Sequence, residues 1–141
     1  MASNFTTPLR DDILNFFFRG NPGSSVTSPA TVYASLHTGD PGRTGAATSE
    51  VSTSGTAYAR TAIAFGAPAD ASGFETVANS GACTFPTATA SYGTVTHAGL
   101  CRTDVEGAAS LYVSVALTAS KAVGNGDTFS FPIGAFTAGI N

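Results

Sequence analysis

The stretch SLYVSVAL at residues 110–117 carries the clearest secondary-structure pattern in this 141-residue sequence. Its apolar residues fall on every second position and alternate mainly with serine and tyrosine. A period of two is typical of a strand with one face in a core and the other toward solvent. The pattern therefore predicts an antiparallel strand. The residues expected to face the core are Leu111, Val113, Val115 and Leu117.

Shorter stretches on both sides of this strand continue the period of two. In one of them, YARTAIAF at 58–65, Ile63 and Phe65 are expected to point inward and Arg60 outward. The other expected strands are 31–37, 80–85, 93–101, 128–131 and 135–140, and the longest loops are 38–50 and 66–79. About seven short strands joined by Gly-rich turns favour an antiparallel β-sandwich or a small barrel.

The N-terminal residues show a helical period instead. Thr7 is expected to cap a helix, Pro8 suits its first position and Gly20 suits its end. Apolar residues recur four, seven and eight positions apart, which places them on one face. These signals predict an amphipathic helix from about residue 8 to 19.

The composition divides the chain into two parts. Residues 20–30, GNPGSSVTSPA, have the composition of a linker. We therefore expect residues 1–30 to form an N-terminal arm of helix and linker. Residues 31–141 are expected to form one β-sandwich domain, which suits a chain of this length.

The apolar face of the predicted helix is the candidate binding site. It includes three consecutive phenylalanines near the helix end, and side chains of this kind are costly to expose to water. The face either packs on the sandwich of its own chain or docks on a neighbouring subunit, and the linker permits both arrangements. The candidate interface residues are Phe5, Leu9, Ile13, Phe16, Phe17 and Phe18.

The charge of the chain argues against some classes of partner. Charged residues make up 11% of the sequence, against roughly 25% in an average domain. The six basic residues are scattered, so phosphate neutralisation does not support nucleic-acid binding. No apolar run approaches the ~20 residues of a membrane helix, and no secretory leader is evident. We expect neither nucleic acid nor membrane as a partner, whereas a low-charge surface favours contact with other proteins.

No pattern of residues predicts a catalytic, cofactor-binding or metal site. His37 and His97 lack the close spacing of zinc ligands, and no G-x-S-x-G motif accompanies the serines. The Gly-rich segments lack the lysine of a phosphate-binding loop. Cys83 and Cys101 fall on expected strands and are interpreted as buried apolar residues, with a disulfide as the alternative. We therefore expect a protein that is not an enzyme and needs no cofactor.

Four segments, taken in order, resemble motifs of a family of small virion proteins from tailed phages. They are LHTGDPG at 36–42, GTAYAR at 55–60, FPTATASYGTVTH at 85–97 and LTASKAVGNGD at 117–127. The resemblance covers about residues 31–138, with Tyr92 at a position where tryptophan is common in the family. Members are often labelled tail fibre proteins, and similar folds serve as capsid decoration proteins. The resemblance implies a structural role and no catalytic residues.

The hypothesis that unites these observations is a capsid decoration, or cement, protein on the exterior of the phage head. Its expected partners are the major capsid protein and copies of itself in a homotrimer, because closed symmetry leaves no open sheet edges. The alternative is a tail fibre or baseplate component that contacts the host surface through loops 38–57 and 66–79. An enzyme acting on the cell wall is a third alternative, which the absence of tryptophan disfavours.

Overall fold

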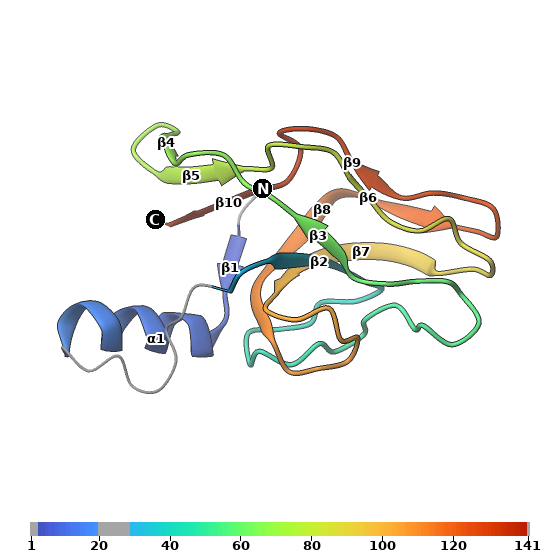
Figure 1. Cartoon of the computed structure of the whole chain (residues 1–141), viewed down its shortest axis with the longest axis horizontal. Helices are drawn as coiled ribbons and strands as arrows, with labels where there is room; N and C mark the ends of the chain where they lie inside the picture. Colours follow the sequence, from blue (N-terminus) through green and yellow to red (C-terminus); the bar gives the residue numbers. More distant parts are fainter. Residues whose placement is uncertain (1–2, 20–28, 141) are drawn as a thin grey trace.

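The computed structural model describes residues 3–19 and 29–140 (Figure 1). Within these residues the chain forms ten strands in three sheets and one N-terminal helix. The predicted fold class, mainly β with antiparallel strands and one N-terminal helix, is confirmed. The elements are β1 (Ser3–Phe5), α1 (Thr7–Phe18), β2 (Val32–His37), β3 (Thr61–Ile63), β4 (Ala69–Asp70), β5 (Glu75–Ala78), β6 (Cys83–Thr84), β7 (Gly93–Cys101), β8 (Leu111–Val123), β9 (Ser130–Phe131) and β10 (Thr137–Ile140).

The largest sheet has five strands in the order β1-β8-β7-β2-β3. Its centre is the hairpin of β7 and β8, the two longest strands. β7 coincides with the strand predicted at 93–101, and β8 begins in the predicted stretch but continues to Val123. β1 pairs with the other side of β8, with Phe5 opposite Val113. The residues just before the helix therefore belong to the main sheet.

Two smaller sheets, β10-β5-β4 and β6-β9, lie beside the five-stranded sheet and share its core (Figure 1). Aromatic rings on and next to their short strands fill this core. The ring centres of Phe129 and Phe131 are 5.0 Å apart, and those of Phe131 and Phe136 are 5.2 Å apart, both edge to face. The ring of Phe85 stacks on that of Tyr58 at 6.1 Å. Because each ring buries roughly 150–250 Å², strands of two residues suffice to close the core.

Two predictions about strands and loops are wrong in part. Residues 66–79, expected as a loop, contain β4 and β5. β5 pairs with β10 near the other end of the chain, with Ala78 opposite Thr137, so its pairing leaves no local signal. The strand expected at 58–65 is present only at Thr61–Ile63. The remaining expected strands are present at shorter lengths than predicted.

The prediction that Arg60 points outward is also wrong. Only 5% of this residue is exposed. Its Nε and one terminal nitrogen donate to the two carboxylate oxygens of Glu50 at 2.7 and 2.8 Å. The other terminal nitrogen donates to the carbonyl of Thr103 and the hydroxyl of Ser110, both at 2.9 Å. The guanidinium turns inward because Glu50 supplies the compensating charge inside the fold.

Glu50 is the second half of this buried ion pair. Its carboxylate also accepts hydrogen bonds from the Tyr58 hydroxyl at 3.1 Å and from the backbone N–H of Gly107 at 2.8 Å. Burial by itself raises the pKa of Glu50, but the bonds from Arg60 and Gly107 outweigh burial and leave that pKa below its ordinary value of 4.5. The pair thus ties the loop 38–57 to the turn between β7 and β8.

Replacing Arg60 by alanine is expected to lower the free energy of unfolding by about 3–5 kcal/mol, because it leaves the Glu50 carboxylate buried without its cation. Urea denaturation followed by circular dichroism measures this change. Arg19→Ala, at an exposed arginine after the helix, is the matched control and should stay within about 0.5 kcal/mol of the unmodified protein. An Arg60→Ala variant as stable as this control would contradict the role assigned to the pair.

Candidate interaction surface

Helix α1 is fixed to the body at its first turn. Thr6, not the predicted Thr7, is its N-cap residue, and the Thr6 hydroxyl donates to the carbonyl of Leu111 at 2.8 Å rather than to the helix. The backbone N–H of Thr6 donates to the carbonyl of Tyr112 at 2.9 Å, and that of Thr7 donates to the carbonyl of Arg43 at 2.7 Å. These bonds set the direction in which the helix leaves the body.

The loop 38–57 also contacts this first turn, at a glycine. Gly45 has a φ of +86°, in the left-handed region that favours glycine. A Cβ at this position would lie 3.0 Å from Cγ of Pro8, closer than atoms pack in ordinary contact. The close approach of the Pro8 ring to the loop therefore requires glycine at position 45.

The rest of α1 projects from the body, with its C-terminal end farthest away (Figure 1). Phe5 and Leu9 pack against the core of their own chain, and Ile13 is half-buried. The predicted helix end at Gly20 and residues 20–28 of the predicted linker lie outside the described residues. We call the exposed apolar end of the helix the helix tip: Leu14, Phe16, Phe17 and Phe18, with exposed fractions of 54, 46, 70 and 79%.

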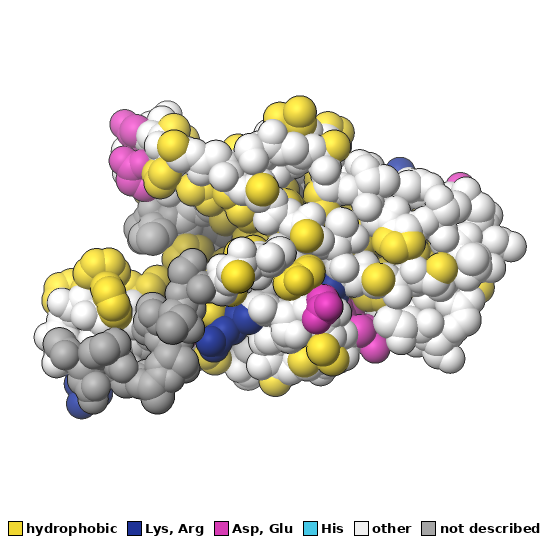
Figure 2. All heavy atoms as spheres, in the orientation of Figure 1, with side chains coloured by type: hydrophobic (Ala, Val, Ile, Leu, Met, Phe, Trp, Pro, Cys, Tyr) yellow, Lys and Arg dark blue, Asp and Glu magenta, His cyan; other side chains and the backbone are white. Residues whose placement is uncertain are grey.

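Apolar side chains gather at the helix tip, and Arg19 follows them directly as an exposed cation. Figure 2 shows hydrophobic atoms gathered on the projecting helix, and few charged side chains over the visible face of the body. The rings of Phe16 and Phe17 contact each other edge to face at 5.0 Å, so the tip is a cluster rather than a row of separate side chains. An exposed apolar cluster of this kind indicates a protein contact site.

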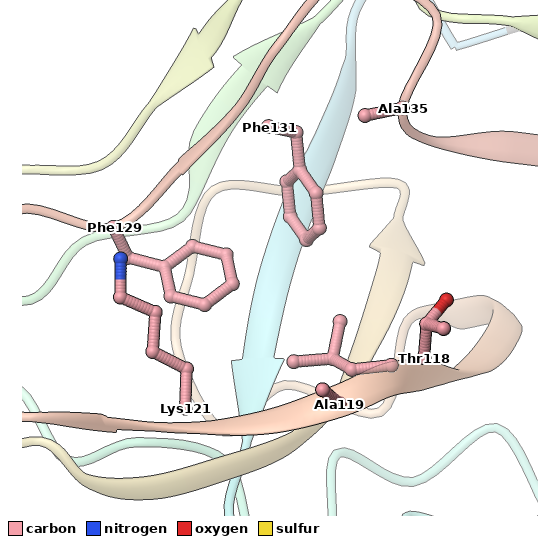
Figure 3. A pocket seen from close by; sticks show the side chains of 7 residues that line it. Thr118, Ala119, Lys121, Phe129, Phe131 and Ala135 are labelled. Atoms are coloured by element: carbon pink, nitrogen blue, oxygen red, sulfur yellow. The ribbon is translucent and has the colours of Figure 1, made fainter.

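An irregular stretch of β8 forms a second apolar surface. Along β7 the pairing passes from Val95 to His97, while along β8 it passes from Lys121 to Ala116, so β8 holds extra residues between the two pairs. A bulge of this kind bends the strand and redirects its side chains. The result is a groove of about 220 Å³ (Figure 3). We call it the β8 groove, and its lining residues are Leu117, Thr118, Ala119, Lys121, Phe129, Phe131 and Ala135.

The floor of the β8 groove is aromatic, and its edge carries one cation. Phe129 and Phe131 belong to the buried core, which fixes their rings (Figure 3). The Lys121 ammonium lies 5.5 Å from the centre of the Phe129 ring, a cation–π geometry. Thr118 and Ala119 of β8 lie on the other side of the groove and are exposed. The groove therefore suits a flat apolar group next to a partial negative charge.

The β8 groove is not among the sites predicted from the sequence. The period of two predicts Leu117 on the inward face of a regular strand, whereas Leu117 is half-buried and lines the groove. The sequence carries a weak signal: apolar and polar side chains still alternate from Leu117 to Ser120, and the alternation breaks at Lys121. Loss of alternation inside a long strand indicates irregular pairing.

His37, one of the two histidines considered as metal ligands, is a buried residue that forms hydrogen bonds inside the fold. Its Nδ1 lies 2.9 Å from the carbonyl of Thr48, so Nδ1 carries the proton and Nε2 accepts from the Ser35 hydroxyl at 2.9 Å. The Cys101 thiol donates in turn to the Ser35 hydroxyl at 3.4 Å. Ser35 and His37 are fully buried, so this contact is closed to a substrate. Burial lowers the pKa of His37 and keeps its ring neutral.

Other polar residues and the second histidine lie in turns and strands. The carboxylates of Asp40 and Asp127 each accept a hydrogen bond from a backbone N–H of their own turn at 2.8 Å. His97 is half-buried on β7. Cys83 is buried as a free thiol, as predicted, and burial raises its pKa to about 11. In the part of the chain that the structure describes, no three His, Cys, Asp or Glu residues are grouped as metal ligands would be, and no helix has the length and apolarity of a membrane span.

Comparison with known protein families identifies the family of this chain. A family model described as podophage GP4 fiber I protein gp80 matches residues 4–139. The chain belongs to this family. The match includes both the helix tip and the β8 groove, and it confirms the resemblance to phage virion proteins labelled as tail fibres. No curated protein matches the sequence.

Replacing both Phe17 and Phe18 of this fibre-family protein by serine is expected to leave the free energy of unfolding within about 0.5 kcal/mol of the unmodified value, because both side chains are exposed. Leu9→Ala, at the rooted end of the same helix, is expected to cost about 1–2 kcal/mol. Urea denaturation in dilute solution compares the two. A tip variant as destabilised as Leu9→Ala would contradict the exposed position of the tip.

Acidification is expected to destabilise the protein in two steps. The pKa of buried His37 lies below its ordinary 6.5, so the unfolded chain takes up a proton that the folded chain does not, and stability falls as the pH drops below about 6.5. The pKa of Glu50 lies below its ordinary 4.5, so a second loss follows as the pH falls from about 4.5 through the folded-state pKa.

Urea midpoints measured from about pH 8 down to about pH 3 resolve these two steps. A His37→Gln variant should lose the first step and retain the second, because it removes the buried imidazole and leaves Glu50 in place. Stability that stays level or rises in the unmodified protein between about pH 7 and pH 5 would show that His37 is not held neutral by the fold.

Proposed function

We propose that the protein is a non-enzymatic structural subunit on the exterior of a phage particle, placed in a fibre, and that the helix tip binds it to a neighbouring virion protein. The helix tip carries this proposal. A helix rooted by Thr6 and Leu9 presents four apolar side chains that the described body leaves exposed. Apolar surface held away from its own core is expected where a second protein covers it.

The placement in a fibre is supported by the family. Its description names a fiber protein, and the match extends over nearly the whole chain, so the similarity is not confined to one shared module. A fibre subunit works by binding and by mechanical stability. A tightly packed aromatic core and a rigid presented helix suit such a role better than an open catalytic cleft would.

Capsid decoration is the second candidate, and the low charge of the chain favours it. Charged residues make up 11% of the sequence, and depletion of charge is the compositional mark of interface cores. A decoration protein would use the same helix tip on the major capsid protein and would form a homotrimer with its copies. The two candidates differ in place and copy number, not in the kind of contact.

The area of the helix tip bears on how strongly it would attach the subunit. At roughly 200 Å² per ring, the exposed fractions of its three phenylalanines leave about 400 Å² of apolar surface to bury. At about 25 cal/mol per Å² this burial contributes up to about 10 kcal/mol. Association itself costs on the order of 4–15 kcal/mol. One tip therefore makes a weak contact, and stable attachment requires further surface or repeated copies.

The test is to quantify the protein in purified particles that carry either the unmodified chain or Phe17→Ser/Phe18→Ser. We expect the variant to be reduced about tenfold or more, because it removes the two most exposed rings of the tip. Val105→Ser removes an exposed apolar residue elsewhere and should be incorporated normally. Normal incorporation of the tip variant would contradict the proposal, as would clearing of host cell walls by the purified protein.

The same measurement separates the two positions. Gel densitometry against the major capsid protein is expected to give on the order of a dozen copies for a fibre, whereas decoration of a symmetric head requires on the order of hundreds. Antibody labelling of the particles in negative stain then gives the place directly. Labelling spread over the head would replace the fibre assignment by capsid decoration.

A further inference from the structure

We infer that the helix tip of one copy binds in the β8 groove of a second copy of the same chain. The inference deepens the proposed function and rests on it, because both assign the helix tip to a contact between subunits. It adds that one surface bound by the helix tip is the β8 groove of another copy. The reach of the helix, the chemical fit of tip and groove, and the exposed area of the tip support this contact.

The helix tip does not occupy the groove of its own chain. The root of α1 is held by the hydrogen bonds of Thr6 and Thr7 to the body, and the helix runs outward from there. In Figure 1, α1 lies at the lower left of the molecule, whereas β9, which carries Phe131 of the groove floor, lies at the upper right. A contact between these two surfaces therefore joins different copies.

The groove fits the tip in size and in chemistry. A cavity of roughly 150 Å³ accommodates benzene, so a groove of about 220 Å³ accommodates one phenylalanine ring. Aromatic rings pack well edge to face on other rings, and Phe129 and Phe131 offer such a floor. Phe17 and Phe18 are the most exposed rings of the tip, at 70 and 79%.

The areas indicate that each copy both gives and receives a contact. The three phenylalanines of the tip offer about 400 Å², roughly half of the 800 Å² per partner in a stable interface. Tip and groove are different surfaces, so each copy gives one contact and receives another. A closed assembly in which every copy does both, either a two-fold pair that exchanges tips or a ring, doubles the buried area per subunit. A ring of three copies would be the homotrimer expected from the sequence.

The experiment uses the full chain and light scattering coupled to gel filtration over the widest soluble concentration range. The tip variant is Phe17→Asp/Phe18→Asp. The groove variants are Ala119→Trp and Ala135→Trp, which fill the groove from exposed positions and leave its buried floor intact. Val105→Asp, at an apolar residue with 59% exposure outside both surfaces, is the control.

We expect the unmodified chain and the control to form closed oligomers, and the tip and groove variants to be monomers. An equal mixture of the tip variant and a groove variant should form a one-to-one dimer, because one intact tip and one intact groove remain. Groove variants that keep the mass of the unmodified chain would show that the tip pairs elsewhere, for example with another tip, and would overturn the inference.

A further outcome separates this inference from the proposed function. An unmodified chain that stays monomeric at every concentration, or variants that do not form the dimer on mixing, would overturn the tip-to-groove contact. If particles still lose the tip variant in that case, the tip binds a different virion protein and the proposed function stands. Normal incorporation of the tip variant would instead contradict the proposed function.

Discussion

The buried ion pair of Arg60 and Glu50 sets the positions of the loops on which the rest of the structure depends. Its guanidinium binds Ser110, the residue just before β8, while its carboxylate lies in the loop that contacts the first turn of α1. The next residue, Leu111, accepts the hydroxyl bond of Thr6 at the helix root. The ion pair, the two loops and the helix root therefore form one connected set, and the direction of the helix follows from it.

An ion pair is seldom the most stable content of a core, because two charges lose their water. Here the cost is offset by complete hydrogen bonding: within the described residues, every buried side-chain nitrogen and oxygen has a partner. Apolar side chains of the same volume would fill the space but would not hold the Thr103 carbonyl and the Ser110 hydroxyl in fixed places. The directional bonds of a guanidinium do so. In a chain with few charged residues, the buried Arg60 and Glu50 thus fix the positions of the loops around them.

The parts that the sequence predicts are those with a local cause. β7, the start of β8 and the helix follow from periods of two and of 3.6, and each is present where expected. The period of two puts Arg60 on the face opposite Ile63 and Phe65, and only its pairing with Glu50 turns it inward. β5 depends on β10 across the chain, and the β8 groove depends on a bulge, so neither has a strong local pattern. The apolar helix face was recognised, but its division into a rooted end and an exposed tip depends on how Thr6 is held.

The weak binding expected of a single helix tip suits a subunit that is held in its assembly by several contacts at once. A contact that barely exceeds the cost of association would hold two copies together only weakly. Once one contact has formed, the next becomes intramolecular in effect, and a ring closes with far greater stability than a single contact has. Such an assembly requires a rigid helix tip, since ordering a mobile helix on binding would cost much of the small free energy of binding. The hydrogen bonds at Thr6 and the close contact of Pro8 with Gly45 provide that rigidity. The strength of assembly would then be set at the root of the helix as much as at its apolar end.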